Sequence, residues 1–131
     1  IQDALNDRRK SVKGSRILLV GVSYKPDVDD VRESPALDLL RLLEQKGADV
    51  RYHDPHVPEL RVDGTKLHSV SLSDSLPESD CVVIVTNHSS LDVAAIVEGA
   101  ALVIDTRNAT QGLSPDGGDG RTAGPKKIQK L

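Results

Sequence analysis

Three short aliphatic runs constrain the fold of this 131-residue chain more than any other feature of its sequence. They are RILLVGV at residues 16–22, CVVIVT at residues 81–86 and ALVIDT at residues 101–106. Their length and their branched side chains favour strands, and since polar residues do not alternate with apolar ones, both faces of each strand are expected to be buried. Strands of this kind occur in parallel sheets that helices cover on both sides.

A helix and a second strand follow the first run. Ser34 followed by Pro35 is typical of a helix N-terminus, because serine can cap the first turn and proline fits its first position. Apolar residues then recur at helical spacing, and Gly47 ends the pattern. The second strand is predicted at residues 48–54, so these elements form a βαβ unit with a right-handed crossover.

The rest of the chain repeats this alternation with shorter elements. A weak strand is predicted near Leu67 to Val70, a short helix near Leu72 to Leu76 and a further helix from about Leu91 to Glu98. The closing residues 126–131, KKIQKL, suit either a short edge strand or a disordered tail. The pattern predicts an α/β fold: a Rossmann-like, doubly wound parallel sheet of five or six strands in three layers.

The length of the chain suits one domain with a short segment at each end. Residues 1–13 are expected to be the end of an inter-domain helix, residues 14–110 the α/β domain, and residues 111–131 a loop and C-terminal tail. Five of the fifteen residues from Gln111 to Pro125 are glycine, which disfavours regular structure there. A chain that begins at Ile1 and contains no methionine is expected to be a piece of a longer protein.

Composition argues against several classes of protein. The 17 basic and 20 acidic residues give a net charge of −3, which disfavours a general nucleic-acid or anionic-membrane binder. No apolar stretch suits a membrane span or a signal peptide, so we expect a soluble, cytoplasmic protein. Cys81 is the single cysteine, which excludes an internal disulfide and a cysteine-based metal cluster. The acidic residues before Ser34 suit solvation of a helix N-terminus, and no metal site is expected.

Ligands of open α/β sheets bind beyond the carboxyl ends of the strands, near the point where strand order reverses. Three loops leave the strongest predicted strands at this edge, and each carries polar or charged groups. They hold Lys25 and Arg32, Asn87 and His88, and Arg107 and Asn108. Several cations around one crevice indicate an anionic ligand such as a phosphate or diphosphate. The first loop lacks both G-x-G-x-x-G and a Walker A sequence, so any phosphate bound here is expected to be held by side chains more than by a glycine-rich cradle.

A long motif in the first half of the chain is recognisable. The run GVSYKPDVDDVRESPALDLLRLLEQKGADVRYHDP, residues 21–55, resembles the C-terminal domain of the UDP-glucose/GDP-mannose dehydrogenase family. CVVIVTNHS and VIDTRN follow in the order that this domain uses, and the resemblance covers roughly residues 1–110. The Y-K-P, H-D-P and N-H-S sequences look closest to the branch that acts on UDP-N-acetylhexosamines.

The resemblance implies a function for the whole protein. Family members have an N-terminal NAD-binding domain, a central helical segment that mediates homodimerisation, and a C-terminal domain that holds the nucleotide end of a UDP-sugar. They oxidise the C6 alcohol of the sugar to a carboxylate, for polysaccharide precursor synthesis, through a covalent intermediate on a cysteine. By the family pattern, Tyr24, Lys25 and Arg107 contact the UDP-sugar and Arg32 approaches NAD. Cys81 opens an apolar strand and cannot be the catalytic cysteine, so the chain alone is expected to be inactive.

Simpler roles remain open for each residue. Lys25 can be a solvated lysine, Arg107 and Arg32 can pair with neighbouring carboxylates, and Tyr24 can either stack on a base or cover the sheet edge. A structural or surface role is expected for His53 and His56, whereas His88 borders the crevice and suits either a structural role or ligand contact. The function has alternatives as well: a stand-alone nucleotide-binding module, or an interaction domain whose loops bind protein.

Overall fold

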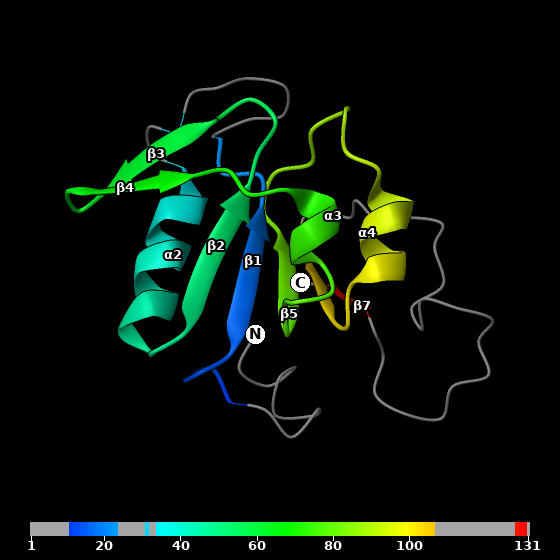
Figure 1. Ribbon diagram of the computed structural model, residues 1–131, viewed down its shortest axis with the longest axis horizontal. Coiled ribbons are helices and arrows are strands. Elements are labelled where there is room, and N and C mark those ends of the chain that lie inside the picture. Colours follow the sequence, from blue (N-terminus) through cyan, green and yellow to red (C-terminus); the bar gives the residue numbers. More distant parts are fainter. Residues whose placement is uncertain (1–10, 24–30, 32–33, 107–127, 131) are drawn as a thin grey trace.

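A five-stranded parallel sheet forms the centre of the structure (Figure 1), a computed structural model that describes residues 11–23, 31, 34–106 and 128–130. The strand order is β2-β1-β5-β6-β7, and each neighbouring pair is parallel. The strands are β1 (Arg16–Val20), β2 (Asp49–His53), β5 (Cys81–Ile84), β6 (Val103–Asp105) and β7 (Ile128–Lys130). The predicted α/β class and parallel sheet are confirmed.

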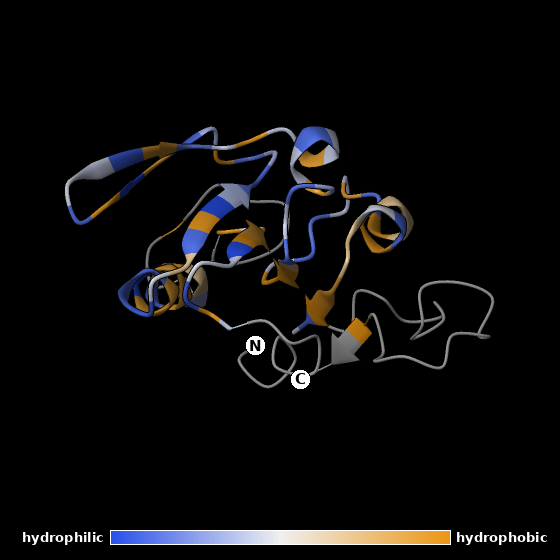
Figure 2. Ribbon diagram, turned by 60° about the horizontal axis from the view of Figure 1, so that its bottom comes forward, coloured by the Kyte–Doolittle hydropathy of each residue, from blue (hydrophilic) through white to orange (hydrophobic). Residues whose placement is uncertain are grey.

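The helices lie on both faces of this sheet, as Figure 2 shows. They are α2 (Pro35–Gln45) on one face, and α3 (Leu72–Ser75) and α4 (Val93–Gly99) on the other. Alternate residues of β1 therefore enter two different cores: Leu19 packs in the cluster that α2 covers, and Leu18 in the cluster that α4 covers. Both residues are buried, which explains why the run at residues 16–22 has no polar positions at its centre.

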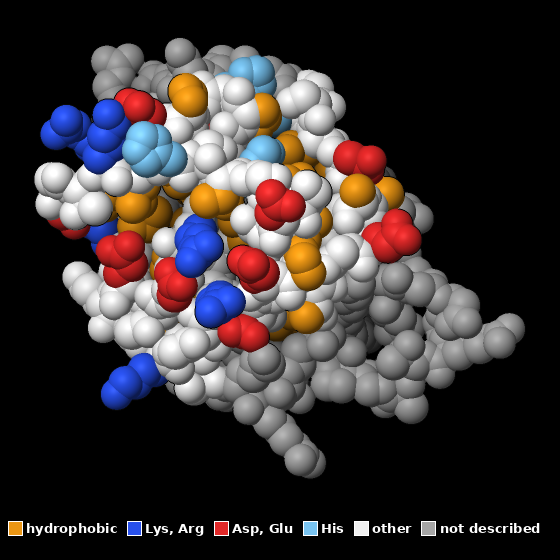
Figure 3. Space-filling model, viewed as in Figure 1, with side chains coloured by type: hydrophobic (Ala, Val, Ile, Leu, Met, Phe, Trp, Pro, Cys, Tyr) orange, Lys and Arg blue, Asp and Glu red, His pale blue; other side chains and the backbone are white. Residues whose placement is uncertain are grey.

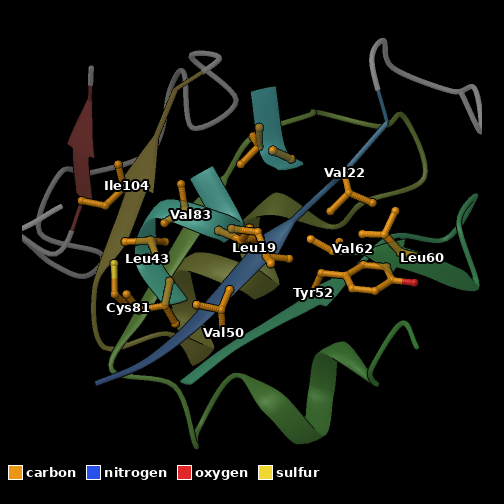
Figure 4. Packing of buried hydrophobic residues seen from close by; sticks show 14 of the residues in the cluster. Leu19, Val22, Leu43, Val50, Tyr52, Leu60, Val62, Cys81, Val83 and Ile104 are labelled. Carbon is orange, nitrogen blue, oxygen red and sulfur yellow. The ribbon is translucent and has the colours of Figure 1, made fainter. Parts of the chain in front are cut away.

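Figure 4 shows the cluster on the α2 side, where Leu43 approaches Val50 and Cys81 while Leu19 and Val83 lie at its centre. Helix α2 begins as its sequence predicts, because the Ala36 amide donates to the Ser34 hydroxyl oxygen at 3.2 Å and Pro35 is the first helical residue. Gly47, at φ +89°, follows the helix in a conformation that glycine adopts without strain.

The segment between β2 and α3 forms a hairpin that lies outside the main sheet. It consists of β3 (Glu59–Val62) and β4 (Thr65–His68), paired antiparallel. The weak strand predicted near residues 67–70 is therefore present in part, since β4 includes Leu67 and His68, but its assignment to the parallel sheet was wrong. The reason is the turn, because Asp63 and Gly64 both have positive φ, 52° and 82°, as a two-residue hairpin turn requires.

Strand β7 supplies the fifth strand of the parallel sheet in place of the 67–70 segment. Ile128 pairs with Val103 and is buried, so the closing residues form the edge strand that was one of their two alternatives. The helix expected at residues 1–13 lies largely outside the described residues, as does the glycine-rich segment before β7. In the part of the chain that the structure describes, no helix has the length and apolar character needed to cross a membrane.

Tyr52 ties the hairpin to the sheet. Its ring is buried in the α2-side cluster with Leu60 and Val62, and its hydroxyl group donates to the carbonyl oxygen of Val57 at 2.9 Å. Burial, followed by the negative charges of Asp54 and Glu59, raises the pKa of Tyr52 to about 12. The neutral phenol is therefore the form that the folded chain holds.

This raised pKa predicts a loss of stability in alkali. The folded pKa lies above the ordinary value of 10, so the contribution of Tyr52 is complete below pH 10 and is lost as the pH rises towards 12. The free energy of unfolding of Tyr52→Phe, measured with urea at pH 8, should be about 1 kcal/mol lower than that of the wild-type chain, since one buried hydrogen bond is lost. The difference should shrink between pH 10 and 12. A difference that stays constant over this range would contradict the assignment.

Candidate functional site

The order of the strands places a topological switch point between β1 and β5. The chain moves outward from β1 to β2 on one side and then continues from β5 to β6 on the other. A crevice is expected beyond the carboxyl ends of β1 and β5, where the connections diverge. The arrowheads of β1 and β2 in Figure 1 mark this edge of the sheet.

Gly21 brings the loop that follows β1 into contact with the residues that follow β5. It leaves β1 at φ +83°, and its amide donates to the carbonyl oxygen of His53 at 2.9 Å. A Cβ atom placed on Gly21 would collide with the carbonyl oxygen of Thr86 and lie 2.7 Å from its Cβ. Glycine is required here for two reasons, the positive φ and the close approach of the Thr86 backbone.

The carboxylate of Asp54 lies at the centre of the edge and joins three loops. Its Oδ2 accepts hydrogen bonds from the amides of Val22 at 2.8 Å and Ser23 at 3.3 Å, and lies 2.9 Å from Nε2 of His88. Its Oδ1 accepts from the His56 amide at 2.8 Å. These residues follow β1, β2 and β5, so one side chain ties together the carboxyl ends of three adjacent strands.

The electrostatics of Asp54 favour its ionised form. Burial raises the pKa of the carboxyl, but the hydrogen bonds from the Val22 amide, the His88 ring and the His56 amide outweigh burial, and the pKa falls below its ordinary value of 3.8. The side chains of Asp54 and His88 are both 0% exposed. A buried carboxylate with four hydrogen-bond donors is a structural anchor, because its donors replace the water that it has lost.

Ser23, His88 and Asp54 do not form a catalytic triad. In a triad, the serine and the aspartate contact opposite nitrogens of the histidine ring. Here Ser23 Oγ lies 3.2 Å and Asp54 Oδ2 2.9 Å from the same nitrogen, Nε2. The ring of His88 also packs against that of His56, with centroids 4.6 Å apart. The geometry supports the structural alternative for His88, and His53, whose Nδ1 lies 2.8 Å from the Val70 carbonyl oxygen, has a structural contact as expected.

Ser23 and Ser34 hold both ends of the segment between β1 and α2. The carbonyl oxygen of Ser23 accepts from Thr86 Oγ1 at 2.7 Å and from Ser34 Oγ at 3.5 Å. Thr106 extends the same edge, because its hydroxyl group donates to the Ile84 carbonyl oxygen at 2.6 Å. The ends of the loops are therefore fixed by hydrogen bonds between them.

The four site residues that the sequence predicts, Tyr24, Lys25, Arg32 and Arg107, lie outside the described residues. Their chain neighbours are described: Ser23 precedes Tyr24, Val31 precedes Arg32 and Thr106 precedes Arg107. Within the described stretches 21–23, 86–90 and 106 of these loops there is no lysine or arginine. The lysine and the two arginines that the sequence predicts for this edge therefore all lie outside the described residues.

Asp54 is not among the residues that the sequence predicts for this edge. The predicted residues lie in the loops after the first, fourth and fifth predicted strands, whereas Asp54 follows the second. The signal was available, since His53-Asp54-Pro55 follows a predicted strand that ends at the same edge of the sheet. What the sequence does not supply is the distance from Asp54 to His88, which depends on the packing of β2, β1 and β5.

Two other surface features fit an anionic ligand less well. A hollow of about 710 Å³ lies between α3 and α4, but its described lining includes Leu72, Leu76 and Glu98 and no lysine or arginine. Figure 3 shows acidic and basic side chains interspersed in the left half of the face that it draws, whereas the charged side chains coloured in its right half are acidic. The hairpin contributes ion pairs such as that of Lys66 with Glu59, whose Nζ and Oε2 atoms lie 3.2 Å apart. Among the described residues, no group of three or more His, Cys, Asp and Glu side chains is arranged to hold a metal ion.

Residues 18–112 match the sequence profile of the UDP-glucose/GDP-mannose dehydrogenase family, UDP binding domain. UDP-N-acetyl-D-mannosamine dehydrogenase of Methanococcus vannielii is 31% identical over 106 residues, covering 75% of this chain and 24% of that protein. UDP-glucose 6-dehydrogenase TuaD of Bacillus subtilis is 32% identical over 116 residues, covering 82% of this chain and 25% of that protein. The chain therefore spans about a quarter of the length of these relatives.

Solved structures share the fold. NDP-N-acetyl-D-galactosaminuronic acid dehydrogenase from Methanosarcina mazei matches with a TM-score of 0.73 and 27% identity, over 98% of this chain and 26% of that chain. UDP-D-ManNAc dehydrogenase from Pyrococcus horikoshii matches with a TM-score of 0.69 and 25% identity, over 98% of this chain and 28% of that chain. Both similarities cover the sheet and the loops at its carboxyl edge.

The contact between Gly21 and Thr86 predicts a large effect of a single methyl group. Gly21→Ala should lower the free energy of unfolding by about 2 to 4 kcal/mol, because both backbone strain and a collision with Thr86 arise. Gly14→Ala is the matched control, since Gly14 has φ +82° but no atom within 4 Å of the added Cβ. Gly14→Ala should lower the free energy of unfolding, measured by urea denaturation, by only about 1 to 2 kcal/mol. Equal losses for the two variants would show that the close approach is absent.

The lowered pKa of Asp54 predicts a loss of stability in acid. Its contribution is present above the ordinary pKa of 3.8 and is lost as the pH falls through the lower pKa of the folded state. At pH 7, Asp54→Asn should be less stable than the wild type by about 3 kcal/mol, because buried donors lose their acceptor. Unfolding measurements should show this difference shrinking below pH 3.8. A constant difference from pH 7 to pH 3 would count against an ionised Asp54.

Proposed function

The chain belongs to the UDP-glucose/GDP-mannose dehydrogenase family as its UDP binding domain, and from this premise we propose that it binds the nucleotide end of the UDP-sugar in a full-length UDP-sugar 6-dehydrogenase. The observation that carries the proposal is the topological switch point between β1 and β5, whose loops are held together by Asp54. The family match at residues 18–112 includes all of these loops. The resemblance found at residues 21–55 agrees with it.

We propose that cations at this edge hold the diphosphate. Lys25 and Arg107 follow the fixed residues Ser23 and Thr106 closely in the chain. An arginine gives a planar two-donor contact to phosphate and a lysine gives a point charge, so the two side chains complement each other. Tyr24 provides an aromatic surface for the uracil base.

NAD, when bound, supplies the hydride acceptor for oxidation of the sugar C6 alcohol. The turn after β1 does not fit a dinucleotide in the usual way, because Gly21-Val22-Ser23 lacks the glycine fingerprint and Ser34 Oγ already caps α2. We propose that NAD is held mainly by parts of the full-length protein outside this chain, with Arg32 approaching it. Cys81 is 0% exposed within β5, so we propose that this chain does not catalyse the oxidation alone.

We propose a UDP-N-acetylhexosamine as the substrate and polysaccharide precursor synthesis in the cytoplasm as the setting, with a homodimeric full-length enzyme. Support for the sugar comes from the Y-K-P, H-D-P and N-H-S sequences and from relatives named UDP-N-acetyl-D-mannosamine dehydrogenase. Relatives named UDP-glucose 6-dehydrogenase have comparable identity. Comparing kcat/KM of the full-length enzyme for UDP-N-acetyl-D-mannosamine and for UDP-glucose distinguishes the two sugars.

The proposed diphosphate contacts predict a specific change in kinetics. In the full-length enzyme, Lys25→Ala and Arg107→Ala should each raise KM for the UDP-sugar by about 10- to 100-fold, because a charge-assisted hydrogen bond to phosphate is lost. The matched controls are Lys66→Ala and Arg51→Ala, whose side chains pair with Glu59 and Asp49 on the surface. They should leave KM unchanged. If both Lys25→Ala and Arg107→Ala leave KM and kcat at wild-type values, the assignment of the site fails.

A further inference from the structure

The hydrogen bond between Asp54 and His88 connects two strands that are not neighbours. Asp54 follows β2 and His88 follows β5, and β1 lies between these strands in the sheet. Their side chains meet at the carboxyl end of β1, where Asp54 Oδ2 also accepts from the Val22 and Ser23 amides. The end of β1 is therefore enclosed by a bridge from its two neighbours.

This bridge lies at the ligand edge but is too deeply buried to touch a ligand. The side chains of Asp54 and His88 are 0% exposed, and Ser23 is also 0% exposed. Besides the contacts of the His88 ring with Ser23 Oγ and His56, its hydrogen bonds include those from three backbone amides, two consecutive ones in the β1 loop and one in the β2 loop. Two donors at one carboxylate oxygen restrict the orientation of the peptide between Val22 and Ser23, and Tyr24 follows that peptide directly.

We propose that Asp54 and His88 are positioning residues that hold the Val22–Ser23 backbone in the form from which the β1 loop binds the UDP-sugar. This inference rests on the proposed function of the same edge. A loop whose start is fixed before binding loses less conformational entropy when the ligand binds, and the gain appears as affinity. Thr86 also holds this backbone in place, because its hydroxyl group donates to the carbonyl oxygen of Ser23 at 2.7 Å.

The proposal predicts that the bridge affects binding more than chemistry. The nucleotide end of the substrate is held alike in the ground state and in the transition state, so weaker binding there raises KM and leaves kcat nearly unchanged. A purely structural role gives a different result: less folded enzyme, lower apparent kcat and an unchanged KM.

Two substitutions at His88 distinguish the effect of its hydrogen-bond donor from the effect of the space that its ring fills. Glutamine places an N–H group near the position of Nε2 and keeps a donor for Asp54, whereas leucine fills similar space without a donor. Asp54→Asn tests the other partner. Whichever way its amide is turned, its NH₂ group faces either the His56 amide or the three donors at Oδ2, so two donors meet.

The experiment measures KM and kcat for the UDP-sugar, Kd for UDP and Tm in the full-length enzyme. His88→Leu and Asp54→Asn should raise KM and Kd about tenfold with kcat within about twofold of wild type, and His88→Gln should restore most of the affinity. Leu43→Ala is the matched control, since it disturbs a buried contact near the start of β2 and should lower Tm with KM unchanged. If His88→Leu does not fold, Thr86→Val removes one bond to the same backbone and should raise KM by a smaller factor.

The outcomes distinguish the positioning role from the proposed function. A raised KM for Lys25→Ala with wild-type KM for folded His88→Leu, Asp54→Asn and Thr86→Val would overturn the positioning role and leave the proposed function standing. A wild-type KM for both Lys25→Ala and Arg107→Ala overturns the proposed function itself. Equal KM values for His88→Gln and His88→Leu would also overturn the positioning role, since the donor to Asp54 would then have no effect on binding.

Discussion

The buried carboxylate of Asp54 is the interaction on which the carboxyl edge of this sheet depends. A charge out of contact with water is costly unless donors surround it, and Asp54 collects donors from the loops after β1, β2 and β5. The same bonds lower its pKa and fix the backbone of Val22 and Ser23. One side chain thus determines how three separate segments of the chain meet.

The rest of the fold brings the loops after β1, β2 and β5 close to Asp54. β1 is buried on both faces, with Leu19 towards α2 and Leu18 towards α4, so it is a rigid centre for the sheet. Gly21 lets the chain leave β1 against the backbone of Thr86, where a Cβ atom would collide with the Thr86 carbonyl oxygen. The parallel pairing of β1 with β2 and β5 then brings Asp54 and His88 to one place. Apolar strands supply stability, and the polar groups at their ends form the candidate site.

Local signals in the sequence predicted the elements that depend on local physics. Ser34 and Pro35 marked the start of α2, and the aliphatic runs marked the buried strands. The hairpin at β3 and β4 was missed although Asp63-Gly64 is a turn signal, because a weak strand was assigned to the parallel sheet by analogy with its neighbours. The role of Asp54 and the burial of His88 depend on contacts between residues 34 positions apart, and no local pattern encodes such a distance.

We propose that a nucleotide diphosphate binds beyond the carboxyl ends of β1, β5 and β6, over a backbone that Asp54 holds in place. A crystal structure of the full-length protein with bound UDP would show where the diphosphate lies. The diphosphate should lie within hydrogen-bonding distance of Lys25 and Arg107, and the hydrogen bonds of Asp54 with Val22 and His88 should be unchanged. UDP bound instead in the hollow between α3 and α4, or elsewhere with this edge unoccupied, would contradict it.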